Sequence, residues 1–173
     1  MNAPLSNSTL IDKDQQHMIH PLHHDAGHSN ARVWVKGEGS HLIDADGNRF
    51  IDGLSCLWNV SCGHGRQSLV DAATKQMEQM AYCSSYNGSS NRPAIELADR
   101  LAEICYPQIN NFYFTSGGGE STDSNFKLAR SYWKAKGKPD KTKVIARTWG
   151  YHGVTFAAMC ATGISGYWTS FEP

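Results

Sequence analysis

Three consecutive glycines, Gly117–Gly119, most constrain how this chain can fold. They follow an apolar run at 110–116 and precede a segment typical of a helix. A strand that ends in glycines and continues as a helix brings several backbone N–H groups and the positive end of the helix dipole together. Without Cβ atoms the backbone can approach an anion closely and adopt positive φ. The stretch predicts an anion or phosphate site, although such a turn can also serve tight packing alone.

The remaining pattern alternates helices and strands. Apolar spacing predicts helices over residues 68–81 and 92–105, with Ser68 and Asp71 resembling a capping box, and the run 154–161 can also be helical. The runs 110–116 and 143–147 are apolar on both faces, as in strands of a parallel sheet covered on both sides. Asp46-Gly47 between two β-rich runs predicts a hairpin. This pattern is typical of an α/β fold with a mixed, mostly parallel sheet and flanking helices.

A second loop follows the strand predicted at 143–147. It holds Tyr151 and His152 between Gly150 and Gly153. Ligands of open α/β sheets bind at the carboxyl edge of the strands, where this loop and the glycines are expected to meet. Tyr151 there could cover one face of a flat ring, or it could simply pack in the core.

Three alternative motifs are absent. No lysine follows the glycines until Lys127, so the stretch is not a P-loop. The dinucleotide pattern G-x-G-x-x-G and the hydrolase pattern G-x-S-x-G do not occur either. A phosphate-ester hydrolase would also need metal or nucleophile motifs, and we find none.

Composition limits the partners and the compartment. Sixteen acidic residues balance sixteen scattered basic ones, which gives no electrostatic surface for nucleic acid or an anionic membrane. The N-terminus lacks the apolar core of a signal peptide, so we expect a cytoplasmic protein. The five cysteines are odd in number and form no C-x-x-C pair, which predicts reduced, inert, buried thiols.

Two polar segments could suggest metal ions, but we predict none. Pro21 breaks the helix that would align the N-terminal histidines, and no known zinc spacing is present among His17, His20, His23, His24 and His28. The start of a calcium loop is imitated by Asp44, Asp46 and Asn48. Arg49 stands where that loop needs glycine, so a turn is the better interpretation.

Several stretches together resemble one family. They are EGSHLIDADGNRFIDG, LWNVSCGHGR, FYFTSGGGESTDSNFKLARSYW and GYHG. In this order and spacing they are similar to the N-terminal portion of class III aminotransferases, pyridoxal-phosphate enzymes of fold type I, and most to omega-amino acid:pyruvate or diamine transaminases. The resemblance implies an N-terminal arm at 1–30, part of the small domain with a linking helix at 31–90, and the incomplete cofactor-binding large domain at 91–173.

The resemblance also implies a set of site residues. The cofactor pyridoxal 5'-phosphate would be bound by Gly117, Gly118 and Gly119 at its phosphate, by Tyr151 stacked on its ring, and by His152 behind the tyrosine. Leu57, Trp58 and Tyr86 would line the substrate pocket. The family usually has serine at position 119, so a hydroxyl contact worth on the order of 1 kcal/mol is missing here.

Part of the family's machinery is expected elsewhere. Transamination needs a Schiff-base lysine and a carboxylate beside the pyridine nitrogen, and no lysine here has the family's sequence context. We therefore expect no catalytic residue in this chain. We expect a split gene product or a fragment, active in at least a dimer with a complementing C-terminal chain, on a small amine and a keto acid. The alternative is a non-catalytic remnant that binds a phosphate ligand or a partner.

Overall fold

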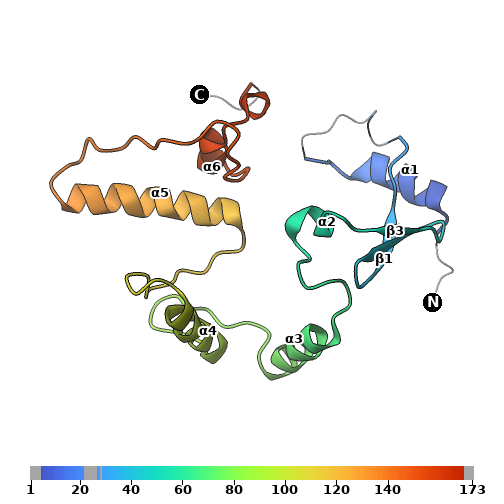
Figure 1. Cartoon of the computed structure of the whole chain (residues 1–173), viewed down its shortest axis with the longest axis horizontal. Helices are drawn as coiled ribbons and strands as arrows, with labels where there is room; N and C mark the ends of the chain where they lie inside the picture. The colour runs from blue at the N-terminus through green and yellow to red at the C-terminus, as the bar shows by residue number, and fades with distance from the viewer. Residues whose placement is uncertain (1–4, 22–26, 28, 170–173) are drawn as a thin grey trace. The chain divides into compact units, whose positions relative to one another are not determined.

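The computed structural model describes residues 5–21, 27 and 29–169. The chain divides into two compact units, Met1–Asn91 and Arg92–Pro173, which are described separately. Figure 1 shows the order of the helices and strands along the chain. Within the described ranges, no helix is both long and apolar enough to cross a bilayer.

The first unit contains a three-stranded antiparallel sheet. Its strands β1 (Trp34–Glu38), β2 (His41–Asp44) and β3 (Arg49–Ile51) pair in sequence order. The turn at Asp46-Gly47 joins β2 to β3, which confirms the predicted hairpin. The buried Asp44 carboxylate accepts hydrogen bonds from the backbone amides of Asp46 (3.1 Å) and Asn48 (2.8 Å), and these bonds fix the turn.

Helix α1 (Asn7–His17) lies in the segment for which the sequence predicted only an arm. Ser6 caps it by accepting the amide of Thr9, but the helix buries no residue, so apolar spacing could not reveal it. Beyond it, His20 contacts Asp14 at 2.8 Å. His23, His24 and His28 lie outside the described residues.

Helix α3 (Gln67–Gln79) confirms the helix predicted over 68–81, but the predicted capping box of Ser68 and Asp71 is wrong. The helix begins one residue earlier than the pattern suggested, with Arg66 as the N-cap and no side chain bonded to the free amides. Ser68 is therefore already inside the first turn, where it cannot act as the cap.

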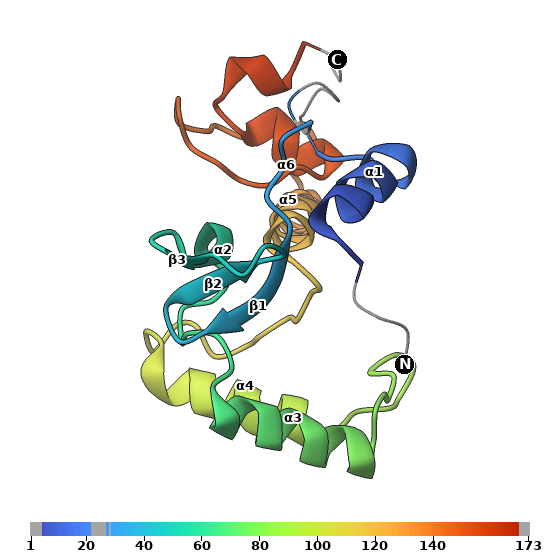
Figure 2. The same cartoon turned by 90° about the vertical axis from the view of Figure 1, so that its right-hand side faces the viewer.

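The described residues of the second unit, 92–169, form three α-helices. Helix α4 (Arg92–Ile104) and helix α5 (Gly118–Ala135), which starts in the glycines, are both as predicted. Helix α6 (Phe156–Ala161) forms in the apolar run, followed by a 3₁₀ turn, η2 (Ser165–Tyr167). Both views place α6 beside the end of α5 that carries the glycines (Figures 1 and 2).

The two runs predicted as sheet strands, 110–116 and 143–147, form no strand in the structure. Thr148 makes only an isolated parallel bridge with Gly163. The reason is that a strand needs a neighbour, and no other described segment pairs with either run. Apolar side chains in both runs, such as Phe114 and Ile145, remain exposed.

Candidate active site

The glycine turn, Gly117–Gly119, opens helix α5. The first hydrogen bond inside the helix runs from the Ser121 amide to the Gly117 carbonyl (3.0 Å). The amides of residues 118–120 therefore have no partner within the helix and lie at the positive end of its dipole. This is the geometry of an anion site. The expected positive φ is wrong, because Gly117 is extended (φ −169°) and neither of the next two glycines lies in the left-handed region.

The three glycines serve different purposes. A Cβ on Gly117 or Gly118 would meet nothing within 4 Å, so these two leave open space beside the free amides. A Cβ on Gly119 would lie 3.0 Å from the Thr155 side chain. A serine at position 119 would therefore need Thr155 to move. Gly119 serves packing, whereas Gly117 and Gly118 keep the anion position accessible.

The tyrosine loop, Tyr151–Gly153, lies directly against the glycine turn. Gly153 has φ +125°, and a Cβ there would lie 2.6 Å from the Gly119 Cα. Only glycine permits both this backbone conformation and this close approach. The two loops, about thirty residues apart in sequence, are thus packed backbone to backbone.

Threonine side chains hold the tyrosine loop in place. Thr122 on α5 has its hydroxyl 2.9 Å from the His152 carbonyl and 3.0 Å from that of Gly118. Thr162, which is fully buried, accepts the His152 amide (3.0 Å) and lies 3.0 Å from the Gly153 carbonyl. These contacts hold the backbone of His152 and Gly153, so this part of the loop has a defined shape before any ligand binds.

Helix α6 is fixed to α5 by a carboxylate. Asp123 accepts the Ala158 amide at 2.8 Å and thereby caps α6. Thr155 occupies the N-cap position of α6, but its hydroxyl makes no capping bond. This hydroxyl is buried and unpaired among the described residues. Asp123 therefore performs the capping that Thr155 would otherwise provide.

The two loops line one pocket of about 580 Å³. Its walls include the whole glycine turn, Tyr151, His152 and Thr155. Glu120 also lines it, but its carboxylate turns back to accept the Ser116 amide (2.8 Å). Hydrogen bonds from Ser116 hold the pKa of Glu120 below its ordinary value, so it is ionised at neutral pH.

The pocket suits a phosphorylated ring compound. Free amides and open space at the glycine turn fit a phosphate, since any larger side chain at Gly117 or Gly118 would fill that space. Tyr151 is 60% exposed and lines the same pocket, so its ring is available to a ligand. The structure thus brings together five of the predicted site residues, Gly117, Gly118, Gly119, Tyr151 and His152.

The supporting residues were not predicted from sequence. Thr122 and Asp123 stand one turn into α5, and Thr162 follows α6. A polar Thr-Asp pair close behind the glycines was the available signal, because short polar side chains near a helix start commonly bond to backbone groups. Nothing in the sequence indicated that their partners lie some thirty residues away.

The other predicted residues, Leu57, Trp58 and Tyr86, belong to the first unit. Leu57 and Trp58 lie on α2 (Ser55–Trp58), a single left-handed turn in which all four residues have φ between 45° and 65°. Left-handed backbone costs a non-glycine residue about 1–2 kcal/mol, so other contacts must hold this turn. Trp58 is 74% exposed and Tyr86 83% exposed. Non-glycine residues held in left-handed backbone cluster at functional sites.

Two side chains stabilise the left-handed turn. The Asp52 carboxylate accepts the Cys56 amide (2.9 Å), and the Asn59 side chain donates to the carbonyls of Cys56 (3.1 Å) and Leu57 (2.9 Å). Asp52 also contacts His64 at 2.9 Å. Hydrogen bonds from Cys56 and His64 lower the pKa of Asp52 despite its partial burial.

Comparison with known proteins agrees with this architecture. The family model described as aminotransferase class-III matches residues 23–173. The chain is 32% identical over 169 residues to the putrescine–pyruvate aminotransferase of Pseudomonas aeruginosa, covering 95% of this chain and 37% of that protein. It is 33% identical over 169 residues to the beta-alanine–pyruvate aminotransferase of the same organism, covering 96% and 38%.

Solved structures agree as well. An (S)-enantioselective omega-transaminase from Thermomicrobium roseum superposes with a TM-score of 0.94 at 42% identity, covering 99% of this chain and 39% of that one. A transaminase from Virgibacillus gives a TM-score of 0.91, also at 42% identity, covering 95% and 38%.

Fold and site together define an N-terminal portion of a pyridoxal-phosphate transaminase of fold type I. The chain belongs to the class III aminotransferase family. It spans a little over a third of the length of the relatives it matches. The fold class and the family predicted from the sequence are confirmed, even though the two central runs lack their strand partners.

Proposed function

We propose that this chain provides part of the active site of an omega-transaminase, which moves an amino group from an amine or omega-amino acid to a keto acid such as pyruvate. The pocket shared by the glycine turn and the tyrosine loop carries this proposal. Membership of the family supports amino-group transfer. Pyruvate stands in the names of the two Pseudomonas aeruginosa relatives.

In this proposal the cofactor is pyridoxal 5'-phosphate, which when bound supplies the electron-accepting ring that amino-group transfer requires. The amides of Gly118 and Gly119 donate to its phosphate, and the α5 dipole adds to the attraction. Gly117 leaves space for the phosphate oxygens. Tyr151 would cover one face of the ring, with His152 behind it, and the threonine bonds to the His152 backbone hold this loop in place.

The substrate side is assigned to the first unit. Leu57 and Trp58 on the left-handed turn, together with Tyr86, are proposed to contact the substrate. They offer exposed apolar and aromatic surface and no charged group, which suits the carbon chain of an amine rather than its ammonium group. The locked turn fixes where Trp58 stands, so this residue is expected to govern which amines are accepted.

Completion of the active site is also a proposal. None of the side chains that line the pocket is a lysine, so its contribution is binding and orientation. We propose that a complementing segment provides the lysine and the carboxylate for the pyridine nitrogen, and that the completed units pair as a dimer at least.

The alternative function is a non-catalytic phosphate-ligand binder, which the same glycine turn would support. The discriminating experiment uses the full protein in its native assembly, titrated with pyridoxal 5'-phosphate while absorbance is followed. Amino-group transfer from an omega-amine to pyruvate is then assayed. Binding with transfer supports the proposal, binding without transfer supports the alternative, and absence of binding contradicts the proposal.

A further inference from the structure

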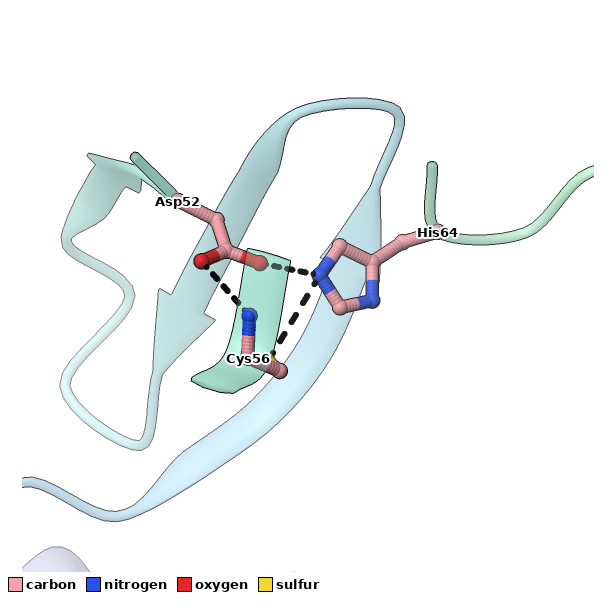
Figure 3. Close-up of side chains that lie close together, drawn as sticks. All are labelled: Asp52, Cys56 and His64. Atoms are coloured by element: carbon pink, nitrogen blue, oxygen red, sulfur yellow. Dashed lines mark hydrogen bonds and ion pairs between the residues drawn. The ribbon is translucent and has the colours of Figure 1, made fainter. Parts of the chain in front are cut away.

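A cluster of three possible metal ligands, Asp52, Cys56 and His64, lies in the first unit (Figure 3). The three come from the end of β3, from α2, and from the loop that bridges back to Gly39. Their ligand atoms all lie within 4.8 Å of one another, and no other such group occurs in the part of the chain that the structure describes. None of the three is assigned a role in amino-group transfer.

The distances suit a small tetrahedral cation. The His64 Nε2 is 2.9 Å from the Asp52 Oδ2 and 3.8 Å from the Cys56 Sγ. Zinc bonds of about 2.0–2.3 Å at tetrahedral angles place two ligand atoms about 3.3–3.6 Å apart. The observed separations bracket this value, so shifts of a few tenths of an ångström would seat an ion among the three atoms.

The ligands are preorganised. Asp52 uses its other oxygen, Oδ1, to accept the Cys56 amide, which leaves Oδ2 directed at His64 (Figure 3). The His64 ring packs on Gly37, where a Cβ would lie 2.5 Å from the ring, and its backbone bonds twice to Gly39. The strained turn that contains Cys56 is thus held on both sides before any ion binds.

The same geometry excludes a nucleophile relay. In a Cys-His-Asp relay the carboxylate bonds one ring nitrogen and the thiol the other. Here both Asp52 and Cys56 approach the same nitrogen, Nε2. Three donors of mixed type that converge on one point are instead the arrangement of a metal site.

We propose that Asp52, Cys56 and His64 bind a borderline-soft divalent cation, with Zn²⁺ as the natural occupant and a fourth position open to water or another ligand. A thiolate, an imidazole nitrogen and a carboxylate are the three ligand types that zinc uses in proteins. On binding, the cation replaces the thiol proton, which leaves to solvent, and the ring proton that Nε2 holds against Asp52 moves to Nδ1, so that the Nε2 lone pair of the neutral imidazole can bind the ion. The ion would tie α2 to the end of β3 and to the His64 loop.

The test uses the full protein in its native assembly, reduced and treated with a chelator, and titrated with Co²⁺ as a coloured probe for zinc. We expect a thiolate-to-cobalt charge-transfer band that saturates at one ion per chain and disappears when Zn²⁺ is added. Cys56→Ser should remove the band. Cys62→Ser is the matched control, because Cys62 is an exposed thiol six residues away, and it should keep the band. Asp52→Asn and His64→Gln should weaken Co²⁺ binding at least about tenfold.

A second measurement on the unmodified protein does not depend on the variants folding. Stoichiometric Zn²⁺ should slow alkylation of Cys56 by iodoacetamide and leave the rate at Cys62 unchanged, as read by peptide mass spectrometry. Absence of the charge-transfer band in the unmodified protein, equal loss of the band in the Cys62→Ser control, or equal protection of both thiols would each overturn the proposal.

Discussion

Gly118 tests the phosphate site at the scale of one residue. Its Cβ position faces open space beside the free amides, so Gly118→Val should fold but fill the anion position. We expect at least about a tenfold loss of affinity for pyridoxal 5'-phosphate, equivalent to about 1.4 kcal/mol. Absorbance titration of the full protein measures it. Gly166→Val is the matched control, because its Cβ also meets nothing within 4 Å and it lies outside the pocket. Equal affinity in a folded Gly118→Val protein would refute the assignment.

Tyr151 tests the ring contact. Its side chain is exposed to the pocket, whereas its loop is fixed through the backbone of His152 and Gly153, so Tyr151→Ala should leave the loop in place. We expect cofactor affinity to fall by roughly 1 kcal/mol, about fivefold, and the bound absorbance spectrum to shift. Tyr151→Phe keeps the ring and should change little. If the alanine variant retained both spectrum and affinity, Tyr151 would be a packing residue.

At the scale of elements, the contact between α5 and the tyrosine loop depends on Gly153. Gly153→Ala would place a Cβ 2.6 Å from the Gly119 Cα at φ +125°, so the loop must move. We expect a loss of about 1–3 kcal/mol in the free energy of unfolding and faster hydrogen exchange in α6. The same substitution at Gly166 should be neutral. Unchanged exchange in α6 would show that the loop tolerates the side chain.

The β2–β3 hairpin gives a prediction about pH. Burial opposes ionisation of Asp44, but hydrogen bonds from Asn48 and Asp46 and the charge of Arg32 outweigh it and lower the pKa below its ordinary 3.8. A lowered folded pKa adds stability above the unfolded value, and this stability is lost as the pH falls through the folded value. Urea unfolding should therefore give the wild type a higher free energy of unfolding than Asp44→Asn at about pH 6. The two free energies should converge towards about pH 3. A difference that stays constant over this range would mean that the Asp44 charge does not stabilise the fold.

The sequence predicted those helices that form because of residues within the segment itself. Apolar spacing located α3 and α4, and the glycines located the start of α5. It predicted strands at 110–116 and 143–147 from their apolar character, but strand formation depends on a partner that apolar character does not supply. The left-handed turn α2 carries no sequence signal either, because its four residues are not glycine and are held by Asp52 and Asn59 from outside the turn.

In the candidate site, too, some residues were predicted from the sequence and others were not. The five pocket residues came from a family pattern together with the expectation that two loops meet at one edge. Thr122 and Asp123 bond to residues about thirty positions away in sequence, and Thr162 bonds to the backbone of the tyrosine loop. The spacing of residues in the sequence does not predict either kind of bond. The assignment of residues 1–30, 31–90 and 91–173 to an arm, a small domain and a large domain of the whole enzyme stays a prediction.

At the scale of the whole molecule, exposed apolar side chains bear on the proposed complementing segment. Phe114 in the run 110–116 and Ile145 in the run 143–147 are both exposed, and the chain spans only a little over a third of its relatives. Runs that are apolar on both faces are stable when strands pair with them and helices cover them. We therefore expect the complementing segment to supply strands adjacent to both runs.

The catalytic lysine is the final test at this scale. The pocket lining offers amides, hydroxyls and aromatic surface but no amine, so a covalent link to the cofactor aldehyde requires a residue from elsewhere. Borohydride treatment of the full, cofactor-loaded protein should fix the cofactor to one lysine outside residues 1–173, as located by peptide mass spectrometry. Residues 1–173 expressed alone should show no transfer from an omega-amine to pyruvate, and co-expression with the complementing segment should restore it. A label on Lys127, Lys143 or any other lysine of residues 1–173, or robust turnover by those residues alone, would show that the chemistry resides in this chain.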